Sequence, residues 1–136
     1  MQKEQEKIGI WIDYDKAFII KISQEKREIK RIESNIEHFH IHGGSRSKVA
    51  YGPQENVSES KLLARKQHQQ NEFFSEVIKE INPKNLIVVF GPAEAKLGLK
   101  KALANHNSFK QKTIAIESTD NMTENQMKAW VSNYTN

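Results

Sequence analysis

Hydrophobic positions alternate with others at the start of the chain. Three isoleucines occupy every second position of residues 8–12, and an acidic turn at 13–16 follows them. This period of two is typical of a β-strand. Residues 17–22 are apolar and rich in β-branched side chains, and residues 28–39 can return antiparallel to them after a short polar link. The pattern predicts three consecutive strands.

A long helix is predicted in the middle of the chain. Asn56 or Ser58 can cap its beginning, and Pro83 ends it. Its second half carries apolar residues at helical spacing, whereas every residue from Arg65 to Gln70 is polar. The polar part therefore either projects beyond the core or lines a polar surface.

Two more strands and two more helices follow. Residues 86–90 are a continuous apolar run, which predicts a central strand, and Pro92 suits the first position of the next helix. A short strand is predicted at 112–116, and Thr123 with Gln126 forms a capping box for the last helix. The predicted order is β-β-β-α-β-α-β-α. This is the order of the ribonuclease H-like fold, an α/β fold with a mixed five-stranded sheet.

Length, composition and charge limit the class of protein. The 136 residues fit a single domain, 1–136, with one core. The chain has no cysteine, which excludes disulfides and thiolate metal sites, and no apolar run long enough to cross a membrane. Its polar beginning lacks the apolar segment of a secretory signal, so we expect a cytoplasmic protein with no membrane partner. The net charge of +4 favours an anionic partner.

A glycine pair lies in a basic, serine-rich segment before the long helix. Residues 43–57 show no hydrophobic periodicity, which predicts a long loop, and such loops are usually functional or disordered. The two glycines let the backbone approach another surface closely, and neighbouring basic side chains supply the charge that meets phosphate. The simpler interpretation is a flexible connection. The residues expected to contact RNA are His42, Gly43, Gly44, Ser45, Arg46, Lys48, Tyr51, Lys61, Arg65, Lys66 and His68.

The helical members of this set share one stripe. Lys61 and Arg65 are four residues apart, and Arg65 and His68 are three apart. Such a stripe is most often a solvated helix face, and the glycine pair before it is what favours a surface that follows phosphates. Tyr51 offers a ring that can stack on a base or pin the loop to the core.

Two metal-dependent functions are alternatives to RNA binding. His38, His40 and His42 alternate along a predicted strand, so their rings share one face and could hold a metal ion. The competing interpretation is a solvated strand face beside an RNA surface, and we expect no bound metal or other cofactor. A nuclease needs several carboxylates around two metal ions. Asp13 is suitably placed after the first strand, but the strand at 86–90 has no acid at its tip.

Three segments carry a resemblance to a known family. Residues 42–44 (His-Gly-Gly), the following loop and the helical residues 64–68 resemble the central domain of eukaryotic and archaeal class-1 peptide release factors and of the ribosome-rescue protein Pelota. Residues 90–100 are similar to a segment in a divergent bacterial group related to that domain, which includes proteins named for host attachment. The resemblance implies a ribonuclease H-like, translational-machinery-component fold and contact with ribosomal RNA or tRNA.

The chain departs from the release factors directly after the glycine pair. In release factors a glutamine follows the pair and helps to place water at the ester of peptidyl-tRNA, whereas Ser45 has a shorter side chain without an amide donor. Gln54 could replace it only if the loop folds back. Pelota lacks the glutamine and acts by binding. We therefore expect a non-hydrolytic RNA- or ribosome-binding protein, with a peptidyl-tRNA hydrolase using Ser45 or Gln54, or a protein-interaction module, as alternatives.

Overall fold

The computed structural model describes residues 6–23, 26–36, 52–83, 85–92, 94–110 and 112–134, with the backbone alone at 52–58. These residues form an α/β structure with five strands and three helices, which confirms the predicted class. The elements are β1 (Lys7–Ile12), β2 (Lys16–Ile22), β3 (Arg27–Glu33), α2 (Gly52–Lys79), β4 (Leu86–Gly91), α3 (Ala95–Ala104), β5 (Ala115–Ser118) and α4 (Glu124–Asn133).

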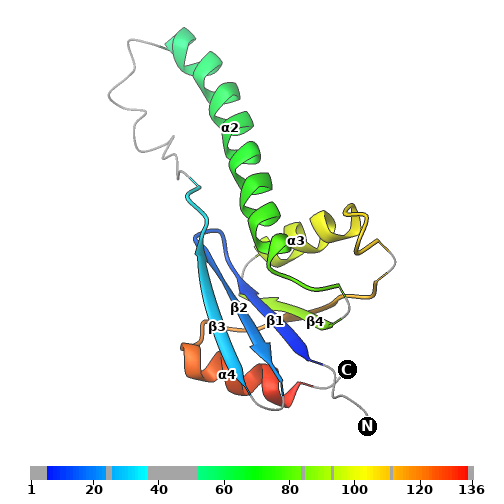
Figure 1. The fold of residues 1–136 in the computed structure, drawn as a ribbon. Helices are drawn as coiled ribbons and strands as arrows, with labels where there is room; N and C mark the ends of the chain where they lie inside the picture. The colour runs from blue at the N-terminus through cyan, green and yellow to red at the C-terminus, as the bar shows by residue number, and fades with distance from the viewer. Residues whose placement is uncertain are drawn as a thin grey trace.

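The described strands form one open sheet in the order β3-β2-β1-β4-β5 (Figure 1). β2 pairs antiparallel with both β1 and β3, whereas β4 pairs parallel with both β1 and β5. The sheet is therefore mixed, as predicted. The strand expected at the centre, β4, lies one place away from it. β1 takes the middle position because the hairpin brings β2 to one side of it and the crossover through α2 brings β4 to the other.

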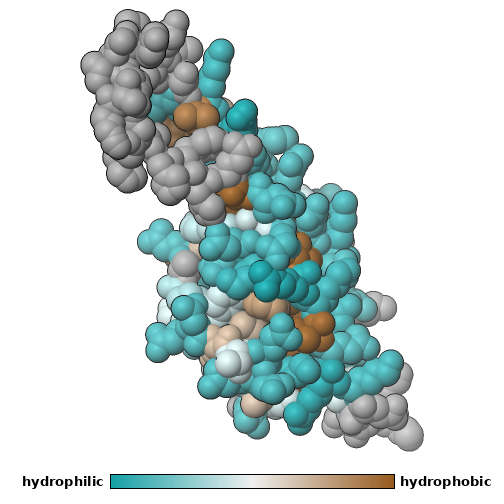
Figure 2. Space-filling view, turned by 90° about the vertical axis from the view of Figure 1, so that its left-hand side faces the viewer, coloured by the Kyte–Doolittle hydropathy of each residue, from teal (hydrophilic) through white to brown (hydrophobic). Residues whose placement is uncertain are grey.

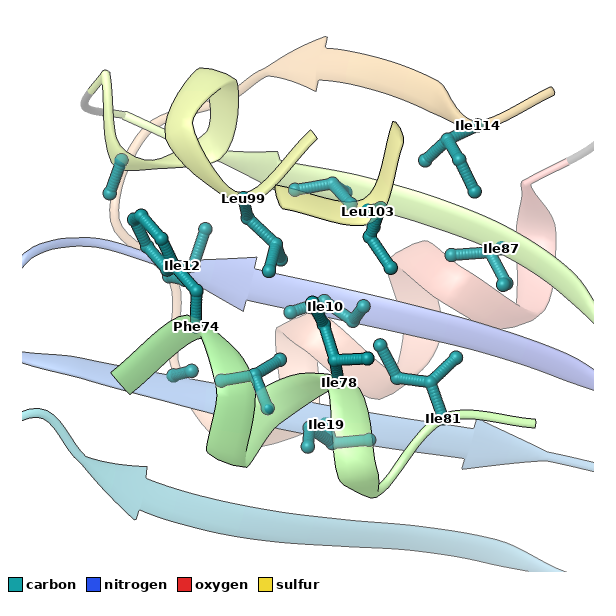
Figure 3. Packing of buried hydrophobic residues seen from close by; sticks show 14 of the residues in the cluster. Ile10, Ile12, Ile19, Phe74, Ile78, Ile81, Ile87, Leu99, Leu103 and Ile114 are labelled. Atoms are coloured by element: carbon teal, nitrogen blue, oxygen red, sulfur yellow. The ribbon is translucent and has the colours of Figure 1, made fainter. Parts of the chain in front are cut away.

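Helices cover both faces of the sheet, and β1 contributes side chains to both. Ile8, Ile10 and Ile12 lie in the cluster under α2 and α3, and Trp11 lies in the cluster under α4. Figure 3 shows the first cluster, in which side chains from the sheet and from both helices point toward one another. Successive side chains of β1 thus point to opposite faces of the sheet and enter two different cores, which explains the alternation that predicted a strand.

The last helix is fixed at both ends. The predicted capping box is present: Thr123 Oγ1 accepts a hydrogen bond from the Gln126 backbone N–H at 3.1 Å, and Gln126 Oε1 accepts one from the Thr123 N–H at 2.9 Å. At the other end, Lys7 Nζ donates to the carbonyl oxygens of Ser132 and Tyr134, each at 2.9 Å. A cation there satisfies carbonyls that lack partners within the helix. This contact ties β1 to the end of α4.

The beginning of α2 differs from the prediction. The helix starts at Gly52, so Asn56 and Ser58 lie inside it rather than at its cap, and the part of the predicted loop from 52 to 57 is helical. Pro53 stands in the first turn, where a missing N–H removes no helical hydrogen bond. Hydrophobic periodicity missed this turn because periodicity reports burial and not helicity.

Three other boundaries also differ. β3 ends at Glu33, since Asn35 has a φ of 56°, which takes the backbone out of the extended conformation. α3 begins at Ala95 with Glu94 as its cap, so Pro92 precedes the helix instead of opening it. The fifth strand occupies 115–118 rather than 112–116. The remainder of the predicted third strand, 37–39, lies outside the described residues.

We expect Gly91→Ala to destabilise the fold. Gly91 has a φ of 145°, and a Cβ atom there would lie 2.6 Å from the carbonyl oxygen of Ile12 on the neighbouring strand. Backbone strain and a clash with a backbone atom act together, so the free energy of unfolding should fall by about 3 kcal/mol, as measured by urea denaturation. Ser118→Ala, at the exposed β5 position paired with Gly91, is the control and should change it by less than about 0.5 kcal/mol. Equal stability of the two variants would contradict the proposed clash.

Candidate functional site

The structure describes only part of the predicted RNA-contacting set. Lys61, Arg65, Lys66 and His68 lie on α2. Gln54, a weak catalytic candidate expected in the loop, instead lies in the first turn of that helix. The predictions for the remaining candidates stay predictions, because these residues lie outside the described part: His38, His40, His42, Gly43, Gly44, Ser45, Arg46, Lys48 and Tyr51.

The first half of α2 projects beyond the sheet (Figure 1). The helix has 28 residues, which corresponds to a length of about 42 Å. Phe73, Phe74, Val77 and Ile78 are buried and fix its second half to the sheet and to α3. In contrast, Leu63 in the first half is 59% exposed. Of the two arrangements that the sequence allowed, the structure has the projecting one.

Lys61, Arg65 and His68, here called the basic stripe, lie on the side of α2 that faces away from the core. Successive residues of a helix turn by ~100°, which places the three within ~60° of one another. By the same rotation, the buried residues of the second half are centred on the opposite side of the helix. All three side chains are exposed, whereas Lys66, off this stripe, is partly buried. The stripe therefore presents basic groups outward along a projecting helix.

Two contacts near the stripe join side chains one turn apart on α2. His68 Nε2 lies 3.1 Å from Glu72 Oε2, one turn further on, and both side chains are about two-thirds exposed. Gln67 Nε2 donates to Asn71 Oδ1 at 3.3 Å. Exposed pairs of this kind add little stability and exchange easily for a stronger partner. The view in Figure 2 shows a mainly hydrophilic surface over the described residues, with hydrophobic groups in small separate spots.

Asp13, the acid considered for a nuclease, holds the turn between β1 and β2. Its Oδ1 accepts hydrogen bonds from the backbone N–H groups of Asp15 at 2.8 Å and Lys16 at 2.9 Å, and its Oδ2 lies 3.4 Å from Lys16 Nζ. These contacts engage the carboxylate in stabilising the turn. Within the described ranges, no three His, Asp or Glu residues are grouped so that they could hold a metal ion.

Two side chains with shifted pKa values connect separate elements. The hydrogen bond from Lys30 Nζ to Glu80 Oε2, 2.8 Å long, lowers the pKa of Glu80. Burial, together with the charge of Glu117, raises the pKa of Tyr134, whose hydroxyl donates to Glu117 Oε2 at 3.3 Å. Both groups lie away from the basic stripe, and each of the two hydrogen bonds joins a strand to the end of a helix.

The segment between α3 and β5 carries no recognisable motif in the sequence. In the structure this segment places Lys110 and Lys112 at one hollow, and a second hollow, also lined by Ser108, borders the end of α2. Its residues come from turns without hydrophobic periodicity, so only the three-dimensional arrangement places them together. None of the described helices is long and apolar enough to span a membrane.

We expect Asp13→Ala to cost about 1 kcal/mol more in unfolding free energy than Asp13→Asn. The asparagine keeps an oxygen that can accept the two backbone hydrogen bonds of the turn, whereas alanine leaves both N–H groups without it. Urea denaturation of both variants measures the difference. A Mg²⁺-dependent rise in the melting temperature of the unmodified chain that Asp13→Asn abolishes would instead assign this carboxylate to a metal.

No protein-family model matches the sequence, and the search of curated proteins found no significant match. The functional interpretation therefore depends on the residues and on the geometry described above.

Proposed function

We propose that this chain is a translation-associated protein with a ribonuclease H-like, translational-machinery-component fold that binds ribosomal RNA or tRNA. The sheet order β3-β2-β1-β4-β5, with β2 antiparallel to its neighbours, supports the fold. So does the position of the helices, which follow β3, β4 and β5 along the chain. The binding surface consists of the basic stripe and the basic segment that leads into α2. A cytoplasmic location accompanies this proposal.

The observation that carries the proposal is the outward-facing stripe on the projecting half of α2. Basic side chains on a projecting element can contact several phosphates of a nucleic acid while the rest of the protein stays clear of it. The helix supplies this reach because, among its described side chains, the buried ones all lie in its second half. Between residues 52 and 71 the helix has three Lys or Arg residues and two Glu residues, so this part of α2 has a net charge of +1.

The proposed role is binding without hydrolysis. Ser45 follows the glycine pair where release factors have their glutamine, and its hydroxyl lacks the amide N–H donors. We therefore expect the protein to leave the ester bond of charged tRNA intact. Release of the aminoacyl group that is lost on Ser45→Ala would favour the hydrolase alternative.

A protein partner is the second candidate, and one observation favours it. Leu63 is 59% exposed and, by the helical rotation, lies on the same side of α2 as the buried residues, but beyond the edge of the core. A partner could cover it. Binding through Leu63 would change little with salt, whereas binding to phosphates weakens steeply as salt rises.

We expect Lys61→Glu/Arg65→Glu to weaken co-sedimentation with ribosomes or bulk tRNA by at least ~10-fold. Each lost phosphate contact should also lower the slope of log affinity against log salt by about one. The charge-matched control is Lys100→Glu/Lys101→Glu on the exposed side of α3. Circular dichroism verifies that both variants keep the helical content of the unmodified chain.

Three results of this experiment would contradict the proposal. If the unmodified chain sediments with neither ribosomes nor tRNA at low salt, the RNA-binding function is wrong. If the control pair weakens binding as much as the stripe pair, net charge explains the effect and the site assignment is wrong. If Leu63→Ala abolishes binding and salt does not affect it, the partner is a protein.

A further inference from the structure

Two open hollows lie along the segment that links α3 to β5, and the smaller one also borders the end of α2. Together they are called the α3–β5 groove here. They share Ser108. The smaller hollow, about 300 Å³, is lined by Ser75, Ile78, Lys79, Ile81, Pro83, His106, Ser108 and Phe109. The larger, about 590 Å³, is lined by Asn107, Ser108, Lys110, Lys112 and Thr113.

The larger hollow has the chemistry of an anion site. Lys110 and Lys112 supply two ammonium groups, and the Ser108 and Thr113 hydroxyls and the Asn107 amide supply neutral donors. Phosphate, with several acceptor oxygens and more than one negative charge, fits such a set better than a single carboxylate does. None of the described lining residues is acidic. The carboxylate of Glu80, just beyond α2, is engaged by Lys30 at 2.8 Å.

The smaller hollow has an apolar floor and an exposed ring at its rim. Ile78 and Phe109 are buried and form part of the floor. The exposed imidazole of His106 stands edge-on to the Phe109 ring, with 5.4 Å between the ring centres. Its Nδ1 accepts a hydrogen bond from the Ser108 backbone N–H at 3.2 Å, which restrains the ring beside the residue shared by both hollows. A planar group can stack on this ring while its edge meets the apolar floor.

We propose that the α3–β5 groove binds a nucleoside monophosphate unit. The base lies in the smaller hollow against His106, and the phosphate lies in the larger hollow on Lys110 and Lys112. Because Ser108 lines both hollows, one ligand with an aromatic end and a phosphate end can reach from one to the other. The ligand is either a free nucleotide or a nucleotide within single-stranded RNA. The groove uses none of the residues of the basic stripe, so this site does not depend on the function proposed for α2.

The test is calorimetric titration of the full chain with AMP, adenosine and inorganic phosphate at low salt. We expect saturable binding of AMP that is tighter than that of either fragment. Lys110→Glu/Lys112→Glu should weaken AMP binding by at least ~10-fold, because two charged donors to the phosphate become repulsive. Lys100→Glu/Lys101→Glu, which changes the net charge equally, should leave AMP binding unchanged. His106→Ala should weaken AMP but not inorganic phosphate.

Several outcomes would overturn the assignment. The groove is not a nucleotide site if AMP does not bind saturably, if adenosine binds as tightly as AMP, or if the two double variants lose AMP binding equally. Displacement of AMP by an oligoglutamate peptide and not by phosphate would assign the groove to an acidic protein segment instead. Urea denaturation of each variant separates lost binding from lost folding.

A competition arm distinguishes the two sources of the nucleotide. Displacement of AMP by a single-stranded oligouridylate hexamer would identify RNA as the source, and retention of AMP would identify the free nucleotide. Ribosome co-sedimentation of the unmodified chain separates this inference from the proposed function. If the unmodified chain sediments with ribosomes but does not bind AMP, the groove alone is refuted. If it binds AMP but does not sediment, the translation role alone is refuted.

Discussion

The central strand β1 is the element on which the rest of the structure depends. It pairs with β2 on one side and β4 on the other, and its side chains supply both cores: Ile10 to the face under α2 and α3, and Trp11 to the face under α4. A strand buried in this way can tolerate few polar groups. Close packing around β1 also requires a glycine on β1 itself and another on the neighbouring strand β4. Gly9 has no side chain because Val131 of α4 occupies the space where its Cβ would be, and Gly91 has none because Ile12 approaches it.

This constraint explains which parts of the fold could be predicted from the sequence. The alternation of Ile8, Ile10 and Ile12 and the apolar run at 86–90 record burial directly, so β1 and β4 could be located closely. The capping box of α4 could be found because hydrogen bonds between Thr123 and Gln126 are local. The α/β class follows from the order of such elements. The place of β4 beside the centre could not be predicted, because it depends on which strands pair.

The features that the sequence did not reveal are those without a buried periodic face. Residues 52–57 show no hydrophobic periodicity in the sequence, so nothing there indicated a helix. The loop predicted at 43–57 was therefore too long at its end, since α2 begins at Gly52. The basic stripe could be predicted, since Lys61, Arg65 and His68 have helical spacing, but its outward direction could not. The α3–β5 groove joins the end of α2 to a segment some 30 residues later, and neither segment has a pattern that indicates the other.

The contact between Lys7 and the carbonyl oxygens at the end of α4 also has a consequence for synthesis of the chain. β1 is made before the other described elements, yet three of its four sides are completed late: α2 and α3 cover one face, β4 supplies one edge, and α4 covers the other face. The hairpin of β1 and β2 therefore leaves the ribosome with both apolar faces uncovered. Pairings this distant in sequence form slowly, and the exposed strand can meet other nascent chains in the interval. The order of the elements thus sets how long apolar strand faces stay exposed during synthesis, whatever the stability of the finished fold.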